Sequence, residues 1–311
     1  MNITLRQLQI FEQVAACGSF TRAAEQLFMT QPAVSQQMRQ LTEQVGEALY
    51  DVVGRQLQIT PAGQALLATW QGMQQEWHCF EEEIAARRGL QRGSLRLAVV
   101  STAKYFIPRV LGPFCQRYPG IDVRLEVANR DRVVERIQRN LDDLYVMTTP
   151  PDHLDLVAEP VLDNPLVVIA APDHPRRDER QIPLAALANE RFIMREAGAG
   201  TRITIEQSLA EQQLRLNVRM ELGSNEAIKQ AVAGGLGLSI LSRHALHRLP
   251  VEEDDVAILD VAGFPLMSQW YLVHLRSKKL SLAATTFLAE LKQWLPAYRQ
   301  HKGLDAHDHT T

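Results

Sequence analysis

The chain of 311 residues has few cysteines, no long apolar run and little net charge. Its three cysteines, Cys17, Cys79 and Cys115, lie far apart and form no CxxC pair, so a disulfide framework is not expected. No segment approaches the roughly 18 uninterrupted apolar residues of a membrane span. The net charge of −3 implies no bulk attraction to nucleic acid or to an anionic membrane.

The sequence also lacks the short motifs of common enzymes and cofactor sites. It contains no GxSxG, HExxH or P-loop motif, and its glycine-rich segments 198–203 and 234–239 do not complete a GxGxxG fingerprint. His301, His307 and His309 are a possible metal set, but a solvated polar tail explains them more simply. We therefore expect no catalytic residue, no metal and no cofactor. The N-terminal residues lack a basic stretch followed by an apolar run, so we expect no signal peptide and a cytoplasmic protein.

The first 60 residues predict a small helical domain. Apolar residues recur at helical spacing from Leu5, Gly18 ends this first helix, and Thr21 is a candidate N-cap of the second. A tight turn at 28–30 leads to a third helix over 31–45, as in a helix-turn-helix. The segment 49–59 then reads as a hairpin wing.

The polar face of the third helix carries side chains that suit DNA. Glutamine and arginine make two-point contacts with adenine and guanine edges, and this face holds Ser35, Gln36 and Arg39. Charge gives little support, because residues 1–65 contain four arginines and five acidic residues. From these residues alone, a polar-faced bundle with no DNA role remains an equal alternative.

Residues 61–88 predict one long helix with an apolar seam. Its apolar positions alternate in steps of three and four: Gly63, Leu66, Trp70, Met73, Trp77, Phe80 and Ile84. At 1.5 Å per residue the helix is about 40 Å long. We expect residues 66–84 of this seam to form a homodimer, and packing onto the chain's own domain is the alternative.

Beyond Gly93 the pattern alternates strands and helices. Strands are predicted at 95–101, 121–127, 142–147, 165–171, near Phe192, and at 217–222, 238–242 and 269–275, with helices between them. This rhythm predicts an α/β domain over 91–296, with doubly wound parallel sheets. Two series of units predict two lobes, about 95–162 plus 269–296 and 163–268, with a cleft between them. A polar tail is expected over 297–311.

Two loops of this domain predict an anion site. Ser101 and Thr102 stand where a strand passes into a helix, with Lys104 close behind, and Gly200, Thr201 and Arg202 open another helix. Free N–H groups at helix starts favour negative charge. Ordinary helix capping is the alternative for each loop alone.

The N-terminal residues resemble a known family. SFTRAAEQLFMTQPAVSQQMRQLTEQVG (19–46), the wing and the ITPAG run (59–63) are similar to LysR-type transcriptional regulators. The resemblance implies a winged helix-turn-helix over 1–60, a linker helix over 61–90 and a two-lobed effector domain of periplasmic-binding-protein type. It further implies that Thr30, Gln31, Ser35, Gln36 and Arg39 face the major groove and that Arg22 and Arg55 contact the DNA backbone. Val52 stands where most members carry an arginine.

A narrower resemblance lies in the effector domain. The STAKYF (101–106) and EVANRDRV (126–133) stretches look like the subgroup that regulates ribulose-bisphosphate carboxylase and other carbon-fixation operons. It implies a phosphorylated or carboxylated metabolite as effector. Where this subgroup often has an MGRPP-like run, the chain has MTTPP (147–151). The expected effector-binding residues are Ser101, Thr102, Lys104, Asn129, Thr148, Thr149, Gly200, Thr201 and Arg202.

The resulting prediction is a ligand-responsive transcription factor. Its expected partners are an interrupted palindromic operator in double-stranded DNA, a small anionic metabolite and further copies of itself in a homodimer or homotetramer; contact with RNA polymerase is compatible with this role. The alternatives are a regulator of another operon with a non-phosphorylated carboxylate effector, an enzyme, or a periplasmic-type solute-binding protein.

Overall fold

The computed structural model describes residues 3–53, 56–87, 92–246 and 255–302. The chain divides into two compact units, residues 1–81 and 82–311, which are taken in turn below. Among the described helices, none combines the length and the hydropathy required to cross a membrane.

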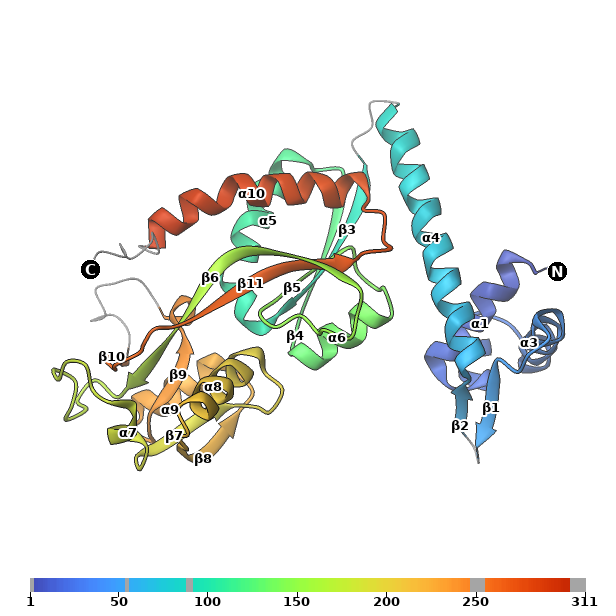
Figure 1. Cartoon of the computed structure of the whole chain (residues 1–311). Coiled ribbons are helices and arrows are strands. Elements are labelled where there is room, and N and C mark those ends of the chain that lie inside the picture. The colour runs from blue at the N-terminus through green and yellow to red at the C-terminus, as the bar shows by residue number, and fades with distance from the viewer. Residues whose placement is uncertain (1–2, 54–55, 88–91, 247–254, 303–311) are drawn as a thin grey trace. The chain divides into compact units, whose positions relative to one another are not determined.

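The first unit is a winged helix-turn-helix, as predicted (Figure 1). Its helices are α1 (Leu5–Cys17), α2 (Phe20–Gln26) and α3 (Gln31–Val45). The strands β1 (Tyr50–Val53) and β2 (Gln56–Ile59) pair antiparallel as the wing, and α4 (Pro61–Arg87) follows.

The helix ends follow local chemistry. Gly18 ends α1 in the left-handed conformation, with φ of 58°. The expected cap at Thr21 was wrong: Ser19 is the N-cap of α2, because its extended backbone lets its hydroxyl accept the Arg22 N–H. Phe28 makes the turn toward α3 with a positive φ of 53°.

The apolar stripe of α3 forms the centre of this unit's core. Val34, Met38 and Leu41 are fully buried. Trp70 of α4 joins the same core at 5% exposure, and its Nε1–H donates to Glu12 of α1 at 2.8 Å. The first half of α4 is therefore part of the first unit's own fold.

The second unit has two lobes. The first contains the parallel strands β3 (Gly93–Val100), β4 (Ile121–Ala128) and β5 (Leu144–Met147), with β3 in the middle. The five-residue 3-10 turn η1 (Ser101–Tyr105) follows β3 directly. The helices α5 (Ile107–Arg117), α6 (Arg130–Gln138) and α10 (Leu282–Lys302) complete this lobe.

The second lobe is built around the parallel pair β7 (Arg191–Arg195) and β8 (Asn217–Leu222). The helices α7 (Leu184–Leu187), α8 (Gly200–Glu211) and α9 (Asn225–Ala233) belong to it. The strands β9 (Ser239–Ser242) and β10 (Ala257–Leu259) both pair antiparallel with the long strand β6 (Leu156–Ala170), and the short turn η2 (Arg243–Ala245) follows β9.

Two long antiparallel strands connect the lobes (Figure 1). These are β6 (Leu156–Ala170) and β11 (Leu266–Leu275), paired from Leu156 opposite Leu275 to Leu166 opposite Leu266. The α/β class is confirmed, and the predicted parallel pairing holds for β3 with β4, β3 with β5 and β7 with β8, but β6 and β11 pair antiparallel, which the prediction of parallel sheets did not include. A chain that crosses to the second lobe and returns beside its own path must run antiparallel.

The last helix continues past the expected start of the tail. We expected a polar tail from Ala297, but α10 runs to Lys302. Tyr298 is 4% exposed, stacks on Trp294 with ring centroids 4.5 Å apart, and shares a hydrogen bond with His244. This packing keeps the segment helical. His307 and His309 lie outside the described residues.

Candidate functional site

A small pocket lies where the two lobes meet. It is bordered by the end of β3 with η1, the ends of β5 and β7, and the starts of α6 and α8. The lining residues are Val100, Ser101, Thr102, Arg130, Thr148, Arg195, Ala199, Gly200 and Thr201. Because β3 and β5 are parallel neighbours, their carboxyl ends bring Thr102 and Thr148 to one edge of the sheet.

The pocket is rich in hydrogen-bond donors. Thr102, Thr148 and Thr201 are all at most 8% exposed, so their hydroxyls have little access to water. Ala199 is the N-cap of α8, and no side chain among the described residues caps that helix end. The first N–H groups of α8 therefore add to the hydroxyls, and the helix dipole makes this edge positive.

Gly200 allows α8 of one lobe to approach β5 of the other. A Cβ atom at this position would overlap the hydroxyl oxygen of Thr148. Only a glycine at position 200, which the sequence analysis placed in a loop that opens a helix, therefore permits this close approach.

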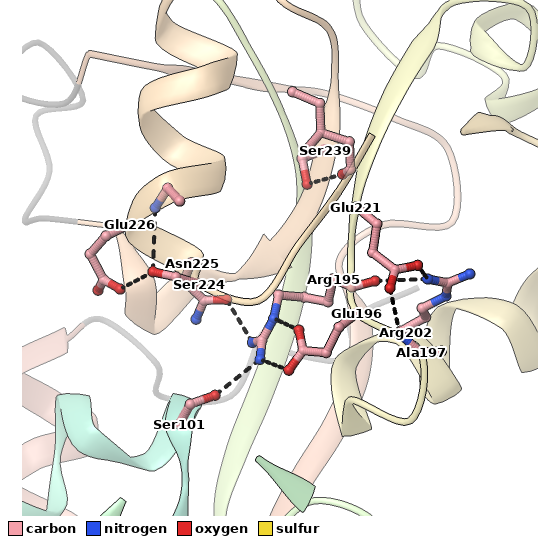
Figure 2. Close-up of polar contacts among 12 residues, drawn as sticks. Ser101, Arg195, Glu196, Ala197, Arg202, Glu221, Ser224, Asn225, Glu226 and Ser239 are labelled. Atoms are coloured by element: carbon pink, nitrogen blue, oxygen red, sulfur yellow. Dashed lines mark hydrogen bonds and ion pairs between the residues drawn. The ribbon is translucent and has the colours of Figure 1, made fainter. Parts of the chain in front are cut away.

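The structure adds two arginines that the sequence analysis missed. Arg130 lines the pocket, and its Nε–H donates to the Thr149 carbonyl at 3.0 Å. Among the described residues, no carboxylate lies within ion-pair distance of Arg130. Arg195 is 3% exposed and contacts Glu196, Asn225 and Ser101 (Figure 2). The sequence did hold one sign of Arg195, because a charged residue at the end of an otherwise apolar buried strand is unusual.

Five of the nine expected effector residues line the pocket: Ser101, Thr102, Thr148, Gly200 and Thr201. Asn129 and Thr149 border it without lining it. The Asn129 side chain caps α6 by accepting the Arg132 N–H at 3.0 Å, and Thr149 provides its carbonyl to Arg130.

The two expected cations point elsewhere. Lys104 pairs with Glu226 at 2.7 Å. Arg202 pairs with Glu206 at 2.7 Å and with Glu221, and it donates to the Arg195 carbonyl at 3.0 Å. Both pair with carboxylates and neither lines the pocket, so the structure does not place these two expected cations in it; the arginines that line it are Arg130 and Arg195.

Glu226 joins the lobes outside the pocket. It accepts hydrogen bonds from Lys104 and from the Tyr105 hydroxyl, each at 2.7 Å, and Tyr105 also accepts from Asn225 at 3.3 Å. Partial burial raises the pKa of Glu226, but the two hydrogen bonds outweigh it and lower the pKa to about 2. Burial and the contact with Glu226 raise the pKa of Tyr105.

The expected DNA-reading face of α3 is open to solvent. Thr30, Gln31, Gln36 and Arg39 are exposed and Ser35 is half-buried, on the side opposite the core stripe. Arg22 is exposed and donates to the Cys17 carbonyl. On the wing, Val52 is 62% exposed, and Arg55 lies outside the described residues.

The apolar seam of α4 divides into two parts. Leu66 and Trp70 pack against the core of the first unit, which was the alternative to dimerisation. Further along the helix, Met73, Trp77 and Phe80 are 47%, 63% and 51% exposed. Ile84 continues the same spacing beyond the boundary of this unit. The free part of the seam therefore starts at Met73.

Two family models match the chain. The model described as bacterial regulatory helix-turn-helix protein, lysR family, matches residues 5–64, and the LysR substrate binding domain matches residues 88–296. The chain belongs to the LysR family of transcriptional regulators.

Similar curated proteins are named as transcriptional regulators, and one of them is named for the RuBisCO operon. The chain is 50% identical to the HTH-type transcriptional activator CmpR of Synechocystis over 92% of this chain and 94% of that protein. It is 46% identical to the RuBisCO operon transcriptional regulator of Acidithiobacillus ferrooxidans, over 93% of each chain.

Solved LysR structures agree with the fold. The regulatory domain of Synechocystis CcmR in complex with 2-PG is 49% identical with a TM-score of 0.63, covering 66% of this chain and 98% of that one. Full-length CbnR complexed with its target DNA is 20% identical with a TM-score of 0.64, covering 94% and 99%. At that identity the second likeness concerns the fold alone.

Proposed function

We propose that this LysR-type regulator controls carbon-fixation genes and responds to a small phosphorylated acid in the pocket between its lobes. The observation that carries the proposal is Arg130, a pocket-lining guanidinium without a carboxylate partner in the described part of the chain. The named roles of the relatives and the 2-PG bound by the related CcmR domain support the choice of ligand.

The local charge balance favours an anion. Glu196 neutralises Arg195, so the excess positive charge comes from Arg130 and from the start of α8. The hydroxyls of Thr102, Thr148 and Thr201 provide further donors. A phosphate or carboxylate gains charge-assisted hydrogen bonds worth about 1.5–3 kcal/mol each, whereas a neutral solute gains only ordinary ones.

Calorimetric titration of the full chain tests this assignment. We expect 2-phosphoglycolate to bind wild type, and Arg130→Gln to bind it at least tenfold more weakly. Arg132→Gln is the matched control, because Arg132 lies on the same helix but pairs with Glu135 at 2.5 Å. No binding of 2-phosphoglycolate, sugar phosphates or dicarboxylates would overturn the proposal. Tighter binding of a non-phosphorylated dicarboxylate would favour a regulator of another operon.

DNA binding belongs to the exposed face of α3. In this proposal Thr30, Gln31, Ser35, Gln36 and Arg39 read the major groove, and Arg22 and Arg55 contact phosphates. A dimer formed through the exposed seam of α4, or a tetramer of two such dimers, binds an interrupted palindrome in the cytoplasm, where it can also contact RNA polymerase.

A gel shift tests the regulatory half of the proposal. The probe is DNA from upstream of the neighbouring operon, titrated with protein in the presence and absence of 2-phosphoglycolate. We expect a specific complex whose affinity or mobility changes with the ligand. An unchanged complex, formed equally well on unrelated DNA, would contradict it.

A further inference from the structure

Arg195 has almost no spare hydrogen-bonding capacity. Its Nε–H donates to Glu196 Oε2 at 2.7 Å, and NH2 donates to Glu196 Oε1 at 2.8 Å (Figure 2). NH2 also donates to Ser101 Oγ at 3.1 Å, and NH1 donates to Asn225 Oδ1 at 2.9 Å. Of the five N–H groups of a guanidinium, four are in use. A ligand cannot take a two-point contact on Arg195 while all these partners stay.

Glu196 is the partner that can leave. Asn225 is 3% exposed, and Ser101 is held in the turn after β3. The Glu196 side chain is 24% exposed, whereas that of Arg195 is 3% exposed, so Glu196 can rotate into water while Arg195 stays in place. Burial raises the pKa of Glu196, but the contact with Arg195 lowers it below its ordinary value, and the group is a carboxylate near neutral pH.

We propose that Glu196 is a built-in competitor for the effector, in that its carboxylate occupies the edge of Arg195 that an anionic ligand takes when it binds. This inference rests on the proposed function, because it concerns the same pocket. Glu196 holds the same two-point geometry on Arg195 that carboxylates and phosphates use. Binding then exchanges one anion for another on the same guanidinium.

The competitor makes the pocket selective for highly charged ligands. A tethered carboxylate acts at an effective concentration in the millimolar range, so a free monocarboxylate of equal charge gains little by replacing it. A phosphorylated acid carries more charge and more acceptor oxygens, and it engages Arg130 and the start of α8 as well. Glu196 is therefore a specificity-determining residue that excludes simple monocarboxylates.

The test compares two neutralised carboxylates in the full chain. Glu196→Gln removes the competitor. Glu206→Gln is the matched control, because Glu206 lies in the same lobe and pairs at 2.7 Å with Arg202, which does not line the pocket. By calorimetry we expect Glu196→Gln to bind 2-phosphoglycolate about tenfold more tightly and to gain measurable affinity for glycolate. Glu206→Gln should stay within twofold of wild type.

A double-mutant comparison separates competition from general repulsion. Arg195→Lys keeps the positive charge but removes the planar guanidinium that makes the two-point contact. In that background Glu196→Gln should raise affinity by less than twofold, whereas an equal tenfold gain would mean general repulsion and overturn the inference. If Arg195→Lys fails to fold by circular dichroism, a structure of the wild-type complex decides: a Glu196 carboxylate still hydrogen-bonded to Arg195 beside the bound anion contradicts competition.

The outcomes also separate the two proposals. If wild type binds 2-phosphoglycolate and Glu196→Gln binds it no more tightly, only the competitor inference fails. If neither protein binds any anion of the panel, the proposed function fails and the inference fails with it.

Discussion

The Tyr105 hydroxyl donates to Glu226 Oε1 at 2.7 Å, and this hydrogen bond joins the turn after β3 to the first turn of α9. Ser101 and Thr102, which line the pocket, lie on the same short turn as Tyr105. The contact therefore fixes the separation of the lobes close to the place where the effector is proposed to bind.

The Glu226 contact predicts a loss of stability in acid. The pKa of Glu226 is lowered from 4.5 to about 2, so its contribution is present above pH 4.5 and is lost as the pH falls toward 2. Thermal unfolding of wild type and Glu226→Gln between pH 7 and pH 2 should show a stability difference that shrinks through this window. A difference that stays constant down to pH 2 would assign the effect to something other than ionised Glu226.

Gly200 predicts a steric limit on closure of the pocket. In Gly200→Ala the new methyl group collides with the Thr148 hydroxyl, so the lobes cannot meet as they do here, and 2-phosphoglycolate should bind at least tenfold more weakly. Adding Thr148→Ala removes the colliding oxygen and should restore part of the affinity. Gly223→Ala is the control, because a Cβ there has open space. No recovery in the double variant would refute the steric explanation.

The recognition face predicts separate losses at two positions. Gln36→Ala and Arg39→Ala should each reduce discrimination between operator and unrelated duplex by about 1–3 kcal/mol, the value of a two-point base contact. Fluorescence anisotropy at fixed salt measures both affinities. Gln9→Ala, an exposed glutamine of α1, is the control and should bind like wild type. Wild-type discrimination in both variants would mean that another face reads DNA.

The exposed part of the α4 seam predicts the dimer contact. Trp77→Asp would place an unpaired charge in an apolar helix pair, at a cost of several kcal/mol. Analytical ultracentrifugation should show loss of the dimer, and operator binding should fall with it. Thr69→Asp, at an exposed position of the same helix, should remain dimeric. A Trp77→Asp protein that sediments as an intact dimer would place the interface elsewhere.

Local sequence patterns located most of the helices and strands and part of the pocket, but not the first half of β6 or the strand β10. The end of the strand at 95–101 located Ser101 and Thr102, and the loop that opens a helix at 200–202 located Gly200 and Thr201, whereas Thr148 came from the resemblance to carbon-fixation regulators. The α3 stripe likewise identified the buried side of that helix.

The cations could not be assigned in the same way. Proximity in sequence suggested Lys104 and Arg202, but a residue one or two positions along a helical turn points in another direction, and Arg202 meets Glu206 four residues later. Arg130 and Arg195 come to the pocket through tertiary packing of different elements. The antiparallel pairing of β6 and β11 could not be predicted from local patterns either, because the sequence of one strand does not show which strand it pairs with.

The strands β6 and β11 cross between the lobes, and this connection sets the order in which the two hydrophobic cores can form during synthesis. The core of the first lobe includes Trp270, Phe287 and Leu291, which leave the ribosome after the whole second lobe. The second lobe's core ends at Val261 and can close while Phe114 still lacks its edge-on partner Phe287. A nascent first lobe therefore keeps apolar surface open until α10 has been made. During that interval the exposed apolar surface is a binding site for ribosome-associated chaperones. A chain truncated before Leu282 would lack α10, and this surface would stay exposed.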